Sequence, residues 1–284
     1  MLKIILNIDN FIIEFVQSFI TPFLTEFFSF LTRFAGEDGL ILFIVLIYIF
    51  FEREKFYQSL CIIAVNLLFV IGVKSTFKRD RPYLNGYKAP DDIYTKGHSF
   101  PSGHSSNITT INLLFNHNFK DVIIKILFIS LNVLIPISRI YLGQHYFTDC
   151  LIGILISLIV TNVLIRVFHH FNFKLDFIFF IVGILLPFLL FIQSNDIYMY
   201  VGILIPLLVF SYLDKKYFNL SSYLKNINKY VLLFLYLIVI FSNFLFLTSS
   251  NLWFNFLRYF IVGSYISFIL PLCCKIFTLI AKKE

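Results

Sequence analysis

The residues best suited to chemistry lie in one short polar stretch, residues 138–149, between two long apolar runs. Charged side chains beside a membrane-length apolar segment are costly, so they point to function. His145 and Asp149 lie four residues apart and share one face if a helix begins near Tyr146. The carboxylate can then accept the imidazole Nδ1–H and leave Nε2 as a base or nucleophile. Arg139 offers a planar fork of donors that suits a phosphate. A plainer alternative, also open at this point, is a set of interfacial side chains at helix ends.

Two other polar clusters contain residues of the same kinds. One holds Lys74 near a predicted helix end and Arg81 in the loop that follows. The other is a Pro-Ser-Gly-His sequence ending at His104, and it predicts a helix start because Pro suits the first turn and Ser102 can cap it. The unpaired N–H groups of such a start bind anions, and Gly103 lets a ligand approach the backbone closely. Cations gathered at one place require an anion, and a phosphate fits in charge and shape.

The composition places these clusters in a membrane protein. The chain has 284 residues, of which 59% are hydrophobic and only 14% are charged. Soluble domains are about 25% charged, so we expect a polytopic, all-α transmembrane bundle. The net charge of +7 comes from residues at helix ends and favours lipid headgroups over nucleic acid as the partner.

The order of apolar and polar segments predicts three regions. Residues 1–35 are amphipathic and predict helices lying on the membrane interface, with a membrane span as the alternative. Residues 36–170 hold all three clusters, and residues 171–284 predict additional transmembrane helices. The apolar runs that define these helices are 40–51, 56–75, 101–116, 122–138, 146–167, 176–193, 197–213, 230–247 and 253–281.

This order of helices brings the three clusters to one membrane face. The opposite face receives most of the remaining Lys and Arg residues and is therefore predicted to be cytoplasmic. We accordingly expect the clusters on the extracytoplasmic face of a plasma or inner membrane.

Together the three clusters resemble the three-part motif of the type 2 phosphatidic acid phosphatase superfamily, and the resemblance covers roughly residues 36–168. That superfamily includes lipid phosphate phosphatases, undecaprenyl pyrophosphate phosphatases, glucose-6-phosphatase and vanadium haloperoxidases. The matching sequences are Lys74-x6-Arg81-Pro82, Pro101-Ser102-Gly103-His104 and Ser138-Arg139-x5-His145-x3-Asp149.

The resemblance implies a six-helix-type phosphatase core and a role for each matching residue. His145 would be the nucleophile that forms a phosphohistidine, with its tautomer held by Asp149. His104 would protonate the leaving oxygen and then activate water. The phosphoryl oxygens would be bound by Lys74, Arg81, Ser102, Gly103 and Arg139. The resemblance implies no metal and no other cofactor.

These predictions combine into one main functional hypothesis. It is an integral-membrane, metal-independent phosphatase of a lipid phosphate or pyrophosphate, such as undecaprenyl pyrophosphate. One alternative is a phosphatase of a soluble phosphate ester, as in the glucose-6-phosphatase branch, and another is a non-catalytic lipid-binding protein. The partners are then the bilayer and a lipid substrate, and residues 171–284 could form a homo-oligomer, bind a partner or only widen the bundle.

Overall fold

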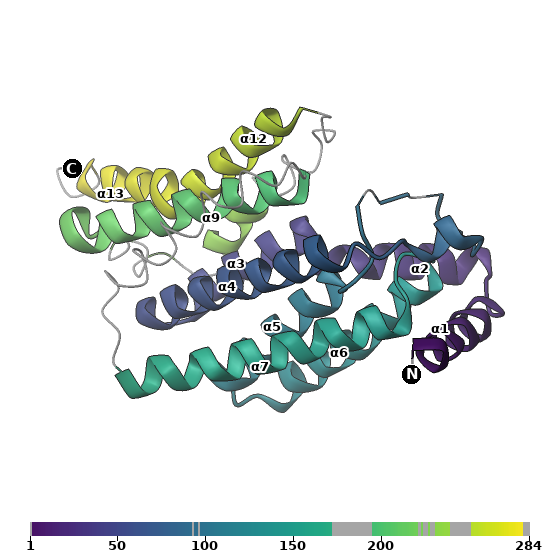
Figure 1. Ribbon diagram of the computed structural model, residues 1–284. Helices are drawn as coiled ribbons and strands as arrows, with labels where there is room; N and C mark the ends of the chain where they lie inside the picture. The colour runs from purple at the N-terminus through teal and green to yellow at the C-terminus, as the bar shows by residue number, and fades with distance from the viewer. Residues whose placement is uncertain are drawn as a thin grey trace. The chain divides into compact units, whose positions relative to one another are not determined.

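The computed structural model describes residues 2–92, 94–95, 97–171, 195–220, 223, 227, 231–238 and 251–280 (Figure 1). Every regular element in these ranges is a helix, which confirms the predicted all-α class. Four described helices are long and apolar enough to cross a membrane, or five if a bent pair counts as one span. The chain is therefore an integral membrane protein. The predicted apolar run 176–193 and the second half of the run 230–247 lie outside the described residues.

The chain divides into two compact units. The first comprises Met1–Leu40 and Ile62–Phe171, and the second comprises Ile41–Cys61 and Asn172–Glu284. All three polar clusters belong to the first unit. The boundaries that the sequence predicts after residues 35 and 170 stay a prediction.

The main helices that the structure describes have the following bounds. They are α1 (Leu2–Gln17), α2 (Pro22–Thr32), η1 (Arg33–Ala35), α3 (Glu37–Phe50), α4 (Arg53–Phe77), η2 (Pro82–Asn85), α5 (Gly103–Asn118), α6 (Val122–Tyr141), α7 (Phe147–Phe171), α9 (Asn195–Leu213), η3 (Asp214–Phe218), α12 (Leu252–Ser264), η4 (Tyr265–Ile269) and α13 (Leu270–Ile280). The sequence predicts that the helix before His145 ends at Ser138, whereas α6 continues to Tyr141 and has Arg139 in its last turn.

Side-chain caps fix where the helices near the clusters begin. Ser102 caps α5 by accepting the backbone N–H of Ser105 at 3.3 Å. Asp121 caps α6 by accepting the N–H groups of Ile123 and Ile124 at 2.8 and 3.0 Å. The helix predicted from residue 101 therefore starts at Gly103, because Ser102 is its cap.

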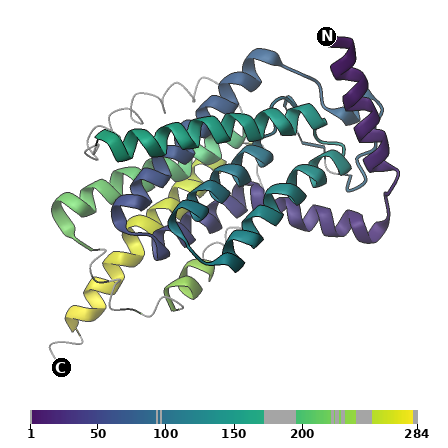
Figure 2. The same ribbon diagram turned by 90° about the horizontal axis from the view of Figure 1, so that it is seen from below.

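The two N-terminal helices form a sharp elbow beside the site. The chain bends by 119° between α1 and α2, both helices pack on α6, and α1 also reaches α7 (Figure 2). Only a narrow face of α1 is buried, where Ile13 packs with Ile140 and Cys150. Its other faces expose large apolar side chains such as Phe11 and Phe15. The predicted interfacial position of this segment stays a prediction.

A buried polar triad joins α4, α5 and α7. The Asn66 amide donates to Ser106 Oγ at 2.7 Å, and Ser106 Oγ lies 2.6 Å from Ser157 Oγ. Ser157 Oγ also donates to Asn66 Oδ1 at 3.2 Å, which closes a ring of three hydrogen bonds. Polar contacts of this kind hold helices together where lipid offers no alternative partner. The triad therefore fixes the axial register of the three helices that carry the predicted site residues.

Close backbone contact fixes the same register near the site. A Cβ added at Gly153 of α7 would lie 2.5 Å from the carbonyl oxygen of Ser102, so only glycine fits there. In addition, Ser102 N–H donates to the Asp149 carbonyl oxygen at 2.9 Å. The first turn of α7 is thus held directly against the start of α5.

We predict that Gly153→Ala destabilises the folded protein, because the new methyl group collides with backbone that cannot move aside. The expected cost is about 1–3 kcal/mol, against the roughly 0.5–1 kcal/mol that Ala gains over Gly in a helix. Gly72→Ala in α4 is the matched control, since nothing lies within 4 Å of its added Cβ. The midpoint of thermal unfolding in detergent should fall for Gly153→Ala only, and equal midpoints in the two variants would contradict this packing.

Candidate active site

The three polar clusters come together around the imidazole of His145. Burial, followed by the positive charges of Arg81, Arg139 and Lys74 and then by His104, lowers the pKa of His145 well below its ordinary value. Of these groups, Arg81 is in direct contact with the ring. The structure thus brings together residues from α4, α5, α6 and the loop after α4, and it keeps the imidazole neutral at pH 7.

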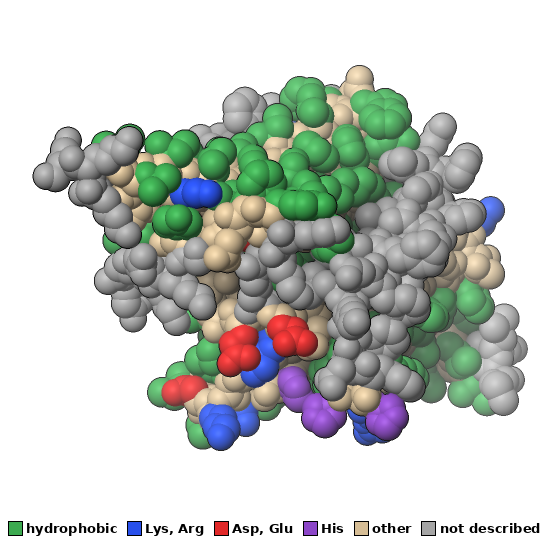
Figure 3. Space-filling model, turned by 90° about the vertical axis from the view of Figure 1, so that its left-hand side faces the viewer, with side chains coloured by type: hydrophobic (Ala, Val, Ile, Leu, Met, Phe, Trp, Pro, Cys, Tyr) green, Lys and Arg blue, Asp and Glu red, His purple; other side chains and the backbone are tan. Residues whose placement is uncertain are grey.

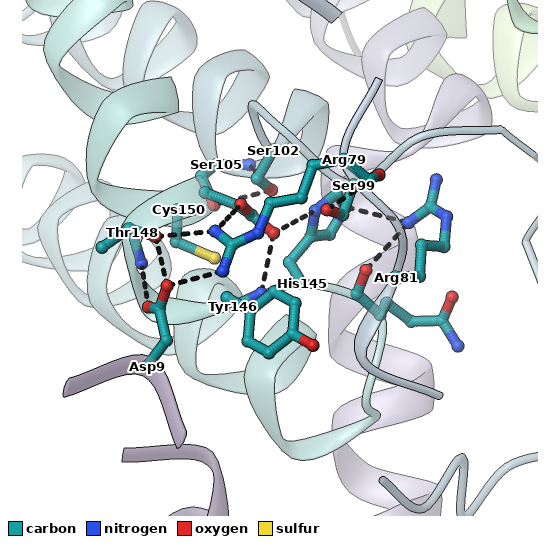
Figure 4. Close-up of polar contacts among 12 residues, drawn as sticks. Asp9, Arg79, Arg81, Ser99, Ser102, Ser105, His145, Tyr146, Thr148 and Cys150 are labelled. Carbon is teal, nitrogen blue, oxygen red and sulfur yellow. Dashed lines mark hydrogen bonds and ion pairs between the residues drawn. The ribbon is translucent and has the colours of Figure 1, made fainter. Parts of the chain in front are cut away.

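Hydrogen bonding assigns the tautomer of His145. Its side chain is 2% exposed, and its Nε2 lies 3.3 Å from Arg81 Nη1 (Figure 4). A guanidinium can only donate, so Nε2 is the acceptor and the ring proton is on Nδ1. Nδ1 lies 3.7 Å from Asp149 Oδ2, and it has no hydrogen-bond partner among the described residues. The predicted Nδ1–Asp149 pair is therefore a close approach beyond hydrogen-bond length.

Two other groups hold the carboxylate of Asp149. Its Oδ2 accepts the backbone N–H of Tyr146 at 2.8 Å, and its Oδ1 accepts Arg79 Nη1 at 2.8 Å. The side chain is fully buried. Both oxygens are thus fixed, and Oδ2 is the one that faces His145 Nδ1.

The two predicted arginines are buried and anchored to the protein. Arg81 donates from Nε to the Gly97 carbonyl at 3.0 Å and from Nη1 to the Gln144 carbonyl at 2.9 Å. Arg139 donates from Nη1 to Thr32 Oγ1 of α2 at 3.2 Å. Their exposed fractions are only 2% and 5%, so each guanidinium has a defined position and charge in a poorly solvated place. Lys74, in the last turn of α4, is partly exposed.

The start of α5 combines free space with backbone donors. A Cβ added at Gly103 would meet nothing within 4 Å, so the first turn opens onto an empty volume. His104 follows Gly103 directly. Its ring lies next to Gly36, since a Cβ added at that glycine would be 3.5 Å from His104 Nε2. Ser102 is fully buried and serves as the helix cap, with Ser105 Oγ donating to it at 3.0 Å. An anion bound next to Gly103 would face the positive end of the helix.

The structure adds residues that the motifs did not single out. Asp9 of α1 and Arg79 of the loop after α4 form an ion pair at 2.7 Å, and Thr148 bonds to both. Asp9 is a charged residue in an apolar run, and because such a charge is costly, the sequence alone could have indicated it as a functional residue. Its partner Arg79 lies 70 positions away, and nothing in the sequence pattern links the two.

Three histidines of the first unit lie away from the site. His117 lies in the last turn of α5, and His169 and His170 lie in the last turn of α7, at the opposite ends of helices that begin at the site. Figure 3 shows histidine side chains gathered together on one face. In the part of the chain that the structure describes, no three His, Cys, Asp or Glu side chains form a group able to hold a metal ion.

Comparison with known proteins shows what the segment that carries this site is similar to. Residues 54–173 match the family model of the PAP2 superfamily and include all three clusters. A lipid A 4′-phosphatase of Porphyromonas gingivalis is 26% identical over 144 residues, which are 46% of this chain and 61% of that protein. The chain therefore matches less than two thirds of the length of this relative.

Two solved structures are also similar to the chain. Aquifex aeolicus LpxE is 24% identical with a TM-score of 0.49, and the match covers 55% of this chain and 93% of that one. The first transmembrane PAP2 type phosphatidylglycerolphosphate phosphatase from Bacillus subtilis is 26% identical with a TM-score of 0.46, over 55% and 83% of the two chains. The family match confirms the resemblance carried by the three motifs: residues 54–173 of this chain match the PAP2 superfamily.

Proposed function

We propose that this protein is an integral-membrane phosphatase that hydrolyses a lipid phosphate or pyrophosphate through a phosphohistidine. The observation that carries the proposal is the state of His145, whose neutral ring presents the Nε2 lone pair to a guanidinium at 3.3 Å. A phosphoryl group that takes up the donors of Arg81 would bring its phosphorus to that lone pair. A neutral imidazole surrounded by cations is suited to attack on a phosphate ester.

The reaction would proceed in two steps. In the first, His104 takes up a proton as the anionic phosphate binds, Nε2 of His145 attacks phosphorus, the bond from phosphorus to the leaving oxygen breaks, and His104 gives that oxygen its proton. In the second, His104 takes a proton from water, the water oxygen bonds to phosphorus, and the N–P bond breaks to release phosphate. The negative charge of Asp149 stabilises the cationic ring between the two steps.

Positive charge for the transition state would come from the protein. Lys74, Arg81 and Arg139 would hold the phosphoryl oxygens, with the N–H groups of the first turn of α5 around Gly103 and the hydroxyl of Ser102. Side chains supply the charge that a metal ion would otherwise provide, and metal independence is part of the proposal for that reason.

A lipid substrate is favoured by where the site lies. It sits at the ends of α4, α5, α6 and α7, and the outer surfaces of α6 and α7 are apolar, with Ile123 and Ile159 strongly exposed. A substrate with its tail in the bilayer could therefore place its phosphate at the site. The relative from Porphyromonas gingivalis is named for a lipid phosphatase activity, which supports the same substrate class.

The proposed membrane orientation puts the site outside the cytoplasm. In the first unit, Lys120 and Lys125 flank the start of α6 and Arg166 lies near the end of α7, so these basic residues lie at the end opposite the site. Basic residues concentrate on the cytoplasmic side of membrane proteins.

We predict that His145→Ala abolishes phosphate release, by at least about 10³-fold, while the protein still inserts in the membrane. The measurement is phosphate release from a panel of lipid phosphates and one soluble ester, in the same detergent with EDTA present. His169→Ala, at the far end of α7, is the control and should be active. Turnover by His145→Ala would show that His145 is not the nucleophile. Loss of wild-type activity in EDTA would refute metal independence. Preference for the soluble ester would refute the lipid substrate class.

A second prediction concerns the pH dependence of kcat/KM. Arg81 disfavours the charged imidazolium, so Arg81→Gln should raise the pKa of His145. The active neutral ring is then lost at a higher pH, and the acid limb of the profile moves upward. Arg81→Lys keeps the charge and should leave the limb near its wild-type position. An acid limb that stays in place or moves downward in Arg81→Gln would show that Arg81 does not act on His145 as described.

A further inference from the structure

Helix α1 places a fully buried carboxylate at the edge of the site. Asp9 accepts the backbone N–H of Thr148 at 2.9 Å and its hydroxyl at 2.6 Å, and it accepts Arg79 Nη2 at 2.7 Å (Figure 4). A buried carboxylate persists only when it is paired and hydrogen-bonded in this way. Asp9 also lies outside residues 54–173, so α1 adds a charged group from beyond the segment that matches the family.

Arg79 connects this carboxylate to the one beside His145. Its Nη1 donates to Asp149 Oδ1 at 2.8 Å and to Thr148 Oγ1 at 2.9 Å, while Nη2 binds Asp9. Its guanidinium carbon lies 4.0 Å from the centre of the Tyr146 ring, which gives it a cation–π contact as well. Arg79 is thus engaged with two carboxylates and one aromatic face. This geometry distinguishes it from Arg81, which contacts Nε2 of His145.

The charges of Asp9, Arg79 and Asp149 explain why two carboxylates are needed to leave negative charge beside His145. Arg79 alone would neutralise Asp149, and the ring of His145 would lose the negative charge that stabilises its cationic form. With Asp9 present, two negative charges face one positive charge, and a net charge of −1 remains beside Nδ1. The two bonds to Asp149, from Arg79 and from the Tyr146 N–H, also prevent its carboxylate from rotating.

We propose that Asp9 and Arg79 are positioning residues, which keep Asp149 aimed at Nδ1 of His145 and leave a net negative charge beside the ring while His145 reacts. This inference rests on the proposed phosphatase function, because it assigns these residues a task in that reaction. Neither residue is expected to touch the substrate. Their loss should therefore slow the reaction without weakening the binding of the phosphate.

The kinetic test compares Asp9→Asn and Arg79→Gln with Glu14→Gln. The control removes an exposed carboxylate from the same helix α1. With dioleoyl phosphatidic acid in mixed micelles, the first two variants should lower kcat by about 10- to 100-fold and leave KM within about threefold. Glu14→Gln should match the wild type. A large rise in KM with an unchanged kcat would assign Arg79 to phosphate binding and overturn the proposal.

A second readout does not depend on activity and separates positioning from a purely structural role. The titration of His145 can be followed by NMR of ¹³C-labelled histidine, assigned by its loss in His145→Gln. Removing the Asp9 charge should lower the pKa of His145, and removing the Arg79 charge should raise it. The charged and titratable groups that act on or lie against the ring in all these variants are Lys74, Arg81, His104, Arg139 and Asp149.

The outcomes distinguish the two proposals. Shifts of opposite sign, together with lower kcat, support the positioning role. Unfolding or loosening of the site would shift both variants in the same direction, and that result, or no shift in either, overturns it whatever the activity. Opposite shifts in a protein that hydrolyses no phosphate would support the electrostatic link and refute the phosphatase function instead.

Discussion

The central constraint in this structure is the accumulation of positive charge around a buried neutral imidazole. The charges of Lys74, Arg81 and Arg139 all act on His145, and the ring has little access to water. A poorly solvated place makes each of these interactions stronger than it would be at a surface. The same field that keeps the ring unprotonated attracts a phosphate, so one arrangement provides both a nucleophile and the affinity for its target.

Such an arrangement requires helix ends that are far apart in sequence to be held at the same level along the axis of the helical bundle. The hydrogen-bonded ring of Asn66, Ser106 and Ser157 sets the register of α4, α5 and α7 inside the bundle. Close to the site, Gly153 allows α7 to touch the backbone of Ser102. The polar residues within these apolar helices therefore position the ends of the helices and need no part in the chemistry.

Much of the site could be predicted from sequence because its parts are local. The Pro-Ser-Gly-His sequence predicts a helix start without information from the rest of the chain. The structure has the helix cap at Ser102 and the first helical residue at Gly103. His145 and Asp149 are close because they are four residues apart at the start of a helix. Each of these features follows from a few neighbouring residues.

Other features depend on contacts that no local pattern specifies. The pairing of Asp9 with Arg79 joins positions 70 residues apart, and the sequence of α1 indicates only an amphipathic helix. The contact of Arg81 with His145 Nε2 also needs the fold, because the motif alone suggests a phosphate ligand. The packing of α1 and α2 on α6 turns a segment predicted as peripheral into part of the unit that holds the site.

The most direct measurement of the central claim is the identity of the phosphorylated residue. The wild-type protein would be mixed with a ³²P-labelled lipid phosphate and quenched in alkali, where phosphohistidine is stable, and the labelled peptide would be mapped. The account predicts label on His145. Label on a serine or an aspartate, or rapid turnover with no labelled protein at any time, would contradict it.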